Sequence, residues 1–441
     1  MGVLGLMNLL RTLDPKIVQS MDLSQLSGGK LAIDVAIAIG AFVFKSQYIS
    51  RVIDKLDCLY YDVDADKANQ YMIFEILRFN FNVLKANVIP VTVFDGKSPA
   101  LKDATKGARI DRTAQVKVKI DELRRIGRCL VDAGQNGRVY QMSPEEIAFL
   151  QSFPKKIESI EGLRHRLKML IKSYIIIKPA EREQIKNILQ IMGLPVVQAP
   201  SEAEFCCAEM AKRKDVSAVY STDSDCIMYG CPIFINKLSY MGGSLVPKPP
   251  IAQCYTYKNA LEVTGLTETQ FSELCIMCGT DFNSNPPGIG PAASLELLKT
   301  FGNIKNMMKV QLEARRFVEL HPKAKLDNIV KKLIKCDFSV LNYDEVRMFI
   351  TTPSGYDPKD LIPNIHPSIA KEAPVKLKAL LSEKYYNKFL PYLNKIIEIL
   401  NVMAKPQKAN KIVKKKEFAF VPPSVPAQKL NLNDSEDHSD E

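Results

Sequence analysis

Histidine is scarce in this chain, and its scarcity limits the chemistry that can be expected. The 441 residues include four histidines, and only His165 lies in the half of the chain that carries the acidic motifs described below. Histidine is the most common general acid or base in enzymes. A mechanism built on a histidine base is therefore not expected.

The ten cysteines lack the paired spacing of a zinc site. The one Cys-x-x-Cys pair, Cys275 and Cys278, lies in the apolar, helix-like run FSELCIMCG and has no second half. Two core thiols are therefore expected there instead of a ligand pair. Cysteine usage of this kind is typical of a reducing compartment.

A long apolar segment is also missing. The apolar run Leu31–Phe44 contains Asp34 and is too short to cross a bilayer. The beginning of the chain lacks the basic region that precedes the apolar part of a secretory signal. We expect no membrane partner.

Basic residues are in excess, with 60 Lys plus Arg against 49 Asp plus Glu and a net charge of +11. A basic surface favours a polyanionic partner such as a nucleic acid. Charge alone also fits a soluble basic protein without such a partner.

Carboxylates recur in short motifs, three of which place an Asp at the end of an apolar, strand-like run. The motifs supply seven acids: Asp34 in KLAID, Asp95 in VTVFDG, Glu202 and Glu204 in APSEAE, Asp223 and Asp225 in STDSD, and Asp281 in CGTDF. One such Asp is commonly a turn or helix-capping residue. In a parallel α/β sheet, however, residues beyond the strand carboxyl ends converge on one crevice.

Seven acids in one crevice would repel one another and raise each other's pKa values unless cations neutralised them. Oxygen-only ligand sets suit hard ions such as Mg²⁺ or Mn²⁺. Two such ions, roughly 4 Å apart, form a clamp that hydrolyses phosphodiesters.

The hydrophobic patterns predict strands and helices in alternation. We expect a strand that ends at Asp34 and further strands over 88–94, 218–221 and 232–236. We expect helices over 4–13, from Asp34 through about Phe44, and over 67–87, 186–192, 202–212 and 268–278. Residues 97–180 are basic and helical, and 310–400 are helical. We divide the chain into an N-terminal region (1–108), a basic helical insertion (109–180), an internal region (181–310), a helical C-terminal region (311–402) and a disordered tail (403–441).

Taken together, these motifs resemble the flap endonuclease/XPG superfamily of structure-specific 5′ nucleases. The resemblance is carried by MGVLGLMNLL with LAIDVAIAI, by IPVTVFDGKSPALK, and by the series from IMGLPVVQAPSEAEFCCAEM to LCIMCGTDFNSNPPGIGPAASLELLKTFG. It implies an α/β fold, with a mostly parallel sheet flanked by helices (a PIN-like nuclease core), a helical arch insertion and a helix-turn-helix element that binds duplex DNA.

The resemblance also implies a division of labour. Asp34, Asp95, Glu202 and Glu204 would hold one Mg²⁺, and Asp223, Asp225 and Asp281 the other, with Mn²⁺ as a substitute. Lys102 and Arg109 would draw the scissile phosphate toward the metals, and their seven-residue separation puts both on one helix face. From the residues alone, a solvated helix face explains these two cations.

Two further regions follow from the same resemblance. The basic stretch between Arg109 and Glu202 would form an arch around a single-stranded 5′ end, and it is longer than in a typical flap endonuclease. Gly288 and Gly290 precede a helix opened by Pro291, so their backbone could approach a phosphate, assisted by a monovalent cation. Gly2 is a third glycine expected to contact DNA.

Two departures from the family are visible. Gly40 stands where many relatives place a stacking Tyr, and Gln407 in the tail lacks the spacing of a sliding-clamp peptide. We expect a monomeric nuclear enzyme that cleaves flapped or branched DNA near junctions. A 5′-3′ exonuclease, a junction-resolving endonuclease, a small-substrate phosphohydrolase and a noncatalytic DNA-junction-binding scaffold remain alternatives.

Overall fold

The computed structural model describes residues 2–35, 52–174, 178–239, 250–361, 369–381 and 383–404. The helix expected through about Phe44, the departure at Gly40 and the tail beyond Ala404 lie outside these residues. Within them, no helix is both long and apolar enough to cross a membrane.

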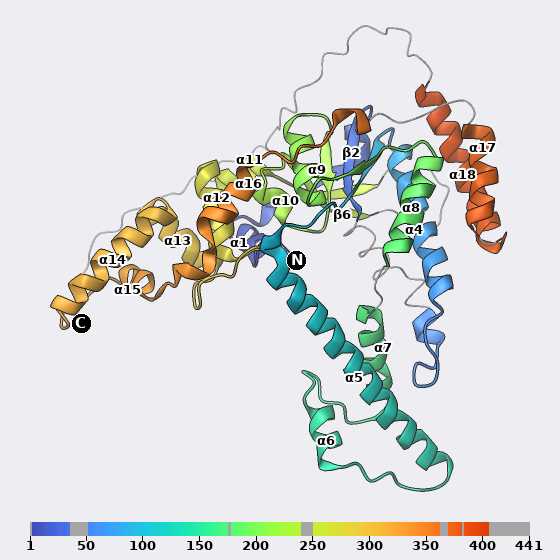
Figure 1. Cartoon of the computed structure of the whole chain (residues 1–441), viewed down its shortest axis with the longest axis horizontal. Helices are drawn as coiled ribbons and strands as arrows, with labels where there is room; N and C mark the ends of the chain where they lie inside the picture. The colour runs from blue at the N-terminus through green and yellow to red at the C-terminus, as the bar shows by residue number, and fades with distance from the viewer. Residues whose placement is uncertain are drawn as a thin grey trace, which may run out of the picture.

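A seven-stranded sheet forms the centre of the molecule (Figure 1). Its strands are β1 (Gln19–Asp22), β2 (Lys30–Asp34), β3 (Ile89–Phe94), β4 (Val196–Gln198), β5 (Ala218–Tyr220), β6 (Ile233–Ser239) and β7 (Ile251–Thr256), in the order β1-β7-β6-β5-β2-β3-β4. The five strands from β6 to β4 are parallel, and β7 and β1 add an antiparallel edge. The carboxyl ends of the parallel strands therefore share one edge.

The central strands are apolar on both faces because helices cover both faces. Ala32 and Val91 pack into the larger core cluster, on the face of α9 (Ala203–Lys212), α10 (Asp225–Met228) and α12 (Glu268–Cys278). Leu31 and Ile33 point to the opposite face and pack with Phe79 of α4 (Ala65–Lys85). This alternation follows from the two-residue period of a strand.

The other helices pack around these layers or extend from them. They are α1 (Leu6–Leu13), α8 (Pro179–Ile191), α11 (Tyr257–Thr264), α13 (Pro291–Phe301), α14 (Ile304–Leu320), α15 (Asn328–Lys335), α16 (Tyr343–Thr351), α17 (Ile369–Leu380) and α18 (Glu383–Ala404), with 3₁₀ turns at Pro15–Ile17, Leu23–Leu26, Ala100–Lys102, Phe338–Leu341 and Pro358–Leu361. Figure 1 shows α8, α17 and α18 beside α4 at one end of the molecule and α14 with α15 at the other.

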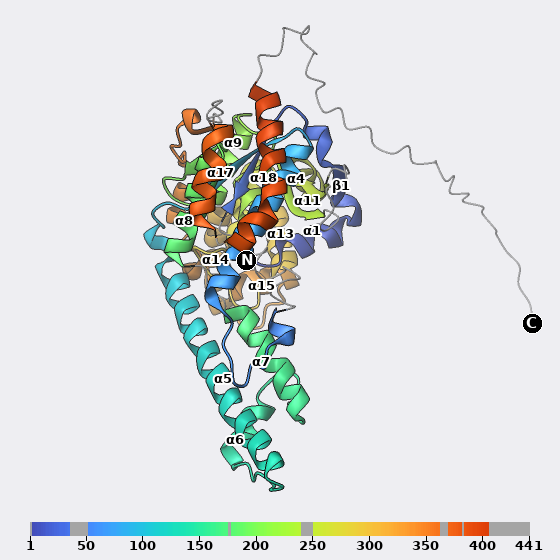
Figure 2. The same cartoon turned by 90° about the vertical axis from the view of Figure 1, so that its right-hand side faces the viewer.

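A long helix, α5 (Asp103–Gln135), projects from the core and carries α6 (Pro144–Gln151) and α7 (Ile160–Tyr174) near its far end (Figure 2). Its first half is largely exposed, and its buried residues Ile120, Leu123 and Ile126 lie where α7 packs against it. A free-standing basic helix of this kind is compatible with an arch. The helix crosses the boundary expected at 108/109 without a break, and the domain division stays a prediction.

The predicted strands at Asp34, 88–94, 218–221 and 232–236 are present as β2, β3, β5 and β6 with small shifts of their ends. The mostly parallel sheet flanked by helices is confirmed. Strands β1, β4 and β7 were not predicted from the sequence. β1 and β4 are the two edge strands and have four and three residues, whereas β7 has six residues and lies between β1 and β6.

Candidate metal centre

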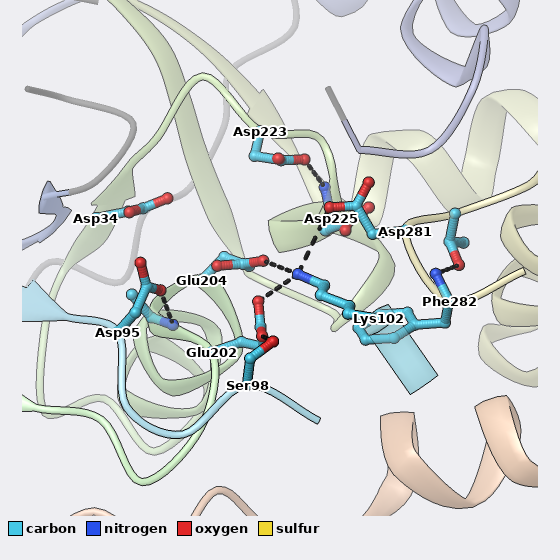
Figure 3. Close-up of polar contacts among 12 residues, drawn as sticks. Asp34, Asp95, Ser98, Lys102, Glu202, Glu204, Asp223, Asp225, Asp281 and Phe282 are labelled. Atoms are coloured by element: carbon cyan, nitrogen blue, oxygen red, sulfur yellow. Dashed lines mark hydrogen bonds and ion pairs between the residues drawn. The ribbon is translucent and has the colours of Figure 1, made fainter. Parts of the chain in front are cut away.

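The seven acids converge on one crevice at the carboxyl edge of the sheet (Figure 3). Asp34 is the last residue of β2, and Asp95 follows β3. Glu202 and Glu204 open α9, Asp223 and Asp225 lie after β5, and Asp281 follows α12. The sheet topology thus brings together side chains that are up to 247 positions apart (281 − 34 = 247).

Asp95, Glu202 and Glu204 form the tightest group. Each offers one carboxylate oxygen, and these oxygens lie within 4.8 Å of one another. Asp95 also fixes the start of α9, because its Oδ1 accepts a hydrogen bond of 3.1 Å from the backbone N–H of Ala203. Among the described residues this trio has the geometry to share one cation.

Asp34 and Asp223 are held by a serine that the sequence analysis did not identify. The hydroxyl of Ser221 donates to Asp34 Oδ2 at 2.9 Å and accepts from the backbone N–H of Asp223 at 3.0 Å. Asp223 in turn accepts from the N–H of Asp225 at 3.1 Å. The position of Ser221 at the start of the STDSD motif, two residues before Asp223, is the sequence feature that could have identified it.

The surroundings of Asp225 show whether the acids fit a metal ion. Its side chain is fully buried, and neither carboxylate oxygen has a hydrogen-bond partner among the described residues. An uncompensated buried carboxylate is costly. Two bare oxygens beside a set of oxygen donors therefore fit a hard divalent cation such as Mg²⁺.

Burial raises the pKa of four of these acids. The pKa of Asp225 is raised well above its usual range by burial and then by the charge of Asp223. The pKa of Glu204 is raised in the same way by burial and by Asp34, and that of Asp223 by burial. The pKa of Asp95 is raised by desolvation and then by Glu202. Each shift comes first from burial of the carboxylate, and neighbouring acids add to it; a bound cation would favour the ionised form against both.

Lys102 lies in the middle of the acids (Figure 3). Its ammonium pairs with Glu202, with Glu204 at 3.3 Å and with Asp281 at 3.5 Å, and it lies 5.0 Å from the centroid of the Phe282 ring. Burial alone would lower the pKa of Lys102, but Glu204 and Glu202 outweigh burial and raise it. Lys102 therefore joins the two acidic groups.

Arg109 approaches the same site from α5. Its Nη2 lies 2.6 Å from Asp281 Oδ2, the oxygen that Lys102 also faces. Thr105, one turn earlier, donates to the backbone carbonyl of Asp281 at 2.7 Å. The prediction that one helix carries both cations is wrong, because Lys102 ends the 3₁₀ turn Ala100–Lys102 and Arg109 lies in α5. Both side chains nevertheless point to the same acid, Asp281.

The three candidate DNA-binding glycines differ in their surroundings. Gly2 has a φ of 94°, and a Cβ there would lie 1.9 Å from Asp223 Oδ1, so the start of the chain packs against the acids. Gly288 is exposed with a φ of 77° and open space around it. Gly290 caps α13 in an extended conformation that other residues adopt, and its open surroundings leave room for a close approach.

Two family models match the chain. The XPG N-terminal domain matches residues 1–116, and the XPG I-region matches residues 193–281. Asp34, Asp95, Lys102 and Arg109 lie in the first segment, and the other five acids lie in the second.

Relatives and solved structures agree with these matches. Flap endonuclease 1 of Trypanosoma cruzi is 29% identical over 318 residues, covering 72% of this chain and 69% of that protein. Flap endonuclease 1 of Leishmania braziliensis is 27% identical over 387 residues, covering 88% and 81%. The catalytic core of Rad2 in complex with DNA substrate shares the fold, with a TM-score of 0.55, 17% identity, and coverage of 90% of this chain and 100% of that one.

The α/β core with an acidic crevice at its carboxyl edge is thus the arrangement of a nuclease. The two family-model matches and the Flap endonuclease 1 relatives support the flap endonuclease/XPG superfamily for this chain.

Proposed function

We propose that this protein is a metal-dependent, structure-specific 5′ nuclease that hydrolyses one phosphodiester of flapped or branched DNA near a junction of single and double strands. The carrying observation is the crevice on which seven acids converge, three of them paired with Lys102 and one, Asp225, with a bare carboxylate. The names of the Flap endonuclease 1 relatives support the choice of substrate.

The acids would hold two Mg²⁺ ions, for which Mn²⁺ can substitute. Asp34, Asp95, Glu202 and Glu204 would serve one ion, and Asp223, Asp225 and Asp281 the other. When bound, the ions lower the pKa of a water molecule and stabilise charge on the leaving oxygen. The protein's own part is to keep these oxygens converged, through Ser221, the start of α9 and the buried core beneath them.

Lys102 and Arg109 would bind the scissile phosphate. Both now neutralise Asp281, so each has to exchange a carboxylate for a phosphate oxygen when DNA enters. The side chain of Arg109, on α5, is partly exposed, whereas the side chain of Lys102 is buried among the acids. Arg109 is therefore positioned to meet the strand before Lys102 does.

DNA outside the crevice would be held by α5 and by the start of α13. The exposed first half of α5 presents Lys106, Arg112 and Lys117 to a single strand. Gly288 and Gly290 would let duplex backbone approach the amino end of α13, where a monovalent cation can assist. Gly2 packs against Asp223 and Ser224, and its backbone would contact the DNA strand beside the acids.

We place the enzyme in the nucleus, because DNA is its proposed substrate and the sequence holds the basic run Lys414–Lys416. A fluorescent fusion should leave the nucleus when these three lysines are changed to Ala. A fusion that stays nuclear would show that the basic run does not direct import.

The test is cleavage of 5′-labelled single-flap, nicked, gapped, blunt and four-way DNA in Mg²⁺ or EDTA. We expect Mg²⁺-dependent incision at the flap base, which Asp223→Ala should abolish. Asp344→Asn is the control and should retain cleavage, because the exposed carboxylate of Asp344 pairs with Lys305 at 3.2 Å and is not one of the seven acids. Preferred cutting of blunt ends or four-way DNA would select the exonuclease or resolving alternative. Tight junction binding without cleavage in any metal would overturn the enzyme assignment.

A further inference from the structure

A small pocket lies beside Asp95 at the carboxyl edge of the sheet. It has a volume of about 170 Å³ and lies between the ends of β3 and β4 and one face of α8. Pockets for drug-sized ligands begin at about 300 Å³, and a water molecule takes about 30 Å³. The pocket is therefore too small for a nucleoside but has room for a phosphate group.

The helix α8 presents two cations to this pocket. Pro179, Arg182, Glu183 and Lys186 line it, and they share one helix face because they are three or four residues apart. Arg182 is exposed and Lys186 is partly buried. Among the described residues, neither cation forms an ion pair with an acid. Both are therefore available to an anion that enters the pocket.

Gln198, the last residue of β4, connects the pocket to the metal centre. Its side-chain amide donates to the backbone carbonyl of Asp95 at 2.5 Å, and its Oε1 accepts from the ammonium of Lys186 at 3.3 Å. An ammonium has three donors, so Lys186 keeps two for a ligand. Gln198 thus holds Lys186 at the strand end that carries a proposed metal ligand.

The two helices that join the projecting part to the core bring cations to different acids. The chain leaves the core through α5 and returns to it through α7 and α8 (Figure 1). Arg109 of α5 contacts Asp281, whereas Arg182 of α8 lines the pocket at Asp95. Asp95 and Asp281 lie toward opposite ends of the group of acids (Figure 3). A strand that crosses the crevice would therefore meet cations at both ends.

Arg182 is close to the crevice without being bound to it. The pKa of Asp95 is raised by desolvation, and the charges of Lys102 and Arg182 oppose this rise. Lys102 and Arg109 are paired with acids of the crevice and have to release them before they bind a phosphate. Arg182 has no such partner among the described residues, so it can bind a phosphate without giving up a carboxylate.

We infer that Arg182 and Lys186 form a second phosphate subsite, which binds the backbone phosphate of the cleaved strand that neighbours the scissile one on the side of Asp95. The inference rests on the proposed nuclease function. With the scissile phosphate at Lys102 and Arg109, a second fixed phosphate aligns the strand across the acids. Arg182 is a positioning residue, because it holds the strand and does not touch the reacting atoms.

The experiment measures kcat/KM on a flap substrate that carries one methylphosphonate, in which a methyl group replaces a charged oxygen, at each phosphate beside the scissile bond in turn. At one position the wild type should lose about tenfold in kcat/KM. Arg182→Gln should lose about tenfold on unmodified DNA and less than about twofold more with the methylphosphonate at that position, because both changes remove the same contact. Arg182→Lys should restore most of the activity.

Glu183→Gln provides a change of opposite sign. The carboxylate of Glu183 lines the pocket and repels a phosphate, so its removal should raise kcat/KM on unmodified DNA about twofold to threefold. A purely structural role for this face of α8 would not produce opposite effects from adjacent residues. Thermal unfolding should show that the variants are folded.

Lys212→Gln is the matched control. Lys212 is exposed and unpaired within the described chain, and it ends α9 roughly 12 Å along the helix axis from Glu204. The variant should cleave like the wild type and keep its sensitivity to the methylphosphonate. The subsite would be overturned if Arg182→Gln cleaved like an active wild type, or if its effect multiplied with that of the methylphosphonate at every position. A wild type that cleaves no flap would overturn the nuclease function as well.

Discussion

The ammonium nitrogen of Lys102 lies 3.5 Å from a carboxylate oxygen of Asp281, and this ion pair joins the two groups of proposed metal ligands. The same ammonium pairs with Glu202 and with Glu204 at 3.3 Å, and the side chain is 7% exposed. A buried lysine thus neutralises oxygens that the metal ions would also use. Lys102 and a divalent cation therefore compete for the crevice.

Lys102→Met should separate metal binding from catalysis. Without the competing ammonium, the DNA-free protein should bind Mn²⁺ about tenfold more tightly, because the unpaired buried acids gain more from a metal. Cleavage of flap DNA should fall by at least about 100-fold, since the phosphate loses a buried cation. Calorimetric titration with Mn²⁺ and single-turnover cleavage measure the two effects.

Lys106→Met supplies the control for this change. Lys106 lies on the exposed first turn of α5 and forms only a loose pair with Asp103 at 3.9 Å. Its replacement should leave Mn²⁺ affinity unchanged. If Lys102→Met weakened Mn²⁺ binding, the competition between lysine and metal would be wrong, and the lysine would instead be needed to shape the ligand set.

Asp225→Asn should stabilise the metal-free protein and inactivate it. The buried carboxylate has no hydrogen-bond partner among the described residues and faces Asp223 and Asp281, so a neutral amide removes repulsion and desolvation cost. We expect the free energy of unfolding in EDTA to rise by about 1 to 3 kcal/mol. Mg²⁺ should stabilise the wild type more than the variant. A variant less stable than wild type in EDTA would contradict the account.

The stability of the metal-free protein should fall as pH rises. The pKa values of Asp95, Glu204, Asp223 and Asp225 are raised in the folded state, so the folded protein binds protons more tightly than the unfolded chain. The resulting stabilisation is fully present below the unfolded pKa of about 4 and is lost as pH rises through the higher folded values.

The midpoint of thermal unfolding in EDTA should therefore decrease between about pH 5 and pH 8, and the decrease should be smaller in Asp225→Asn. Saturating Mg²⁺ should remove or reverse the slope, because the metal favours the ionised acids and binds better at higher pH. A midpoint in EDTA that increases over this range would show that the acids are not crowded in the folded protein.

Much of the site could be predicted because its signals are local. A carboxylate after an apolar run marks the end of a parallel strand, and Asp34 and Asp95 lie there because β2 and β3 are neighbours in register. Because the strands from β6 to β4 are parallel, residues that follow different strands in the chain lie side by side at one edge of the sheet.

The remaining features depend on tertiary contacts that no short pattern encodes. β1 escaped prediction because QSMD is short and polar, and its pairing with β7 joins residues as far apart in the chain as Gln19 and Cys254. The contacts of Lys102 with three acids, the bare carboxylate of Asp225 and the pocket beside Asp95 likewise arise from segments far apart in sequence. Periodicity reports burial, but it does not report which buried polar atoms meet.

The junction of α5 with α7 can be tested with two glycines of the same helix. A Cβ at Gly127 would lie 2.4 Å from Leu59 Cδ2 and 3.0 Å from Leu163 Cδ2, whereas a Cβ at Gly134 meets nothing within 4 Å. Gly127→Ala should lower the free energy of unfolding by about 1 to 2 kcal/mol, because overpacking exceeds the gain in helix propensity. Gly134→Ala should raise it by up to about 1 kcal/mol.

Hydrogen exchange would locate both effects. In Gly127→Ala, faster exchange should be confined to α7, the segment around Leu59 and the half of α5 that they cover, while β2 and β3 keep their protection. Flap cleavage should fall in this variant if the packed end of α5 holds the exposed basic half in place, and Gly134→Ala should cleave like wild type. Equal exchange in the two variants would mean that α7 does not clamp α5 at Gly127, and the projecting helix would then be held only at its base, by Thr105 and Arg109 on Asp281.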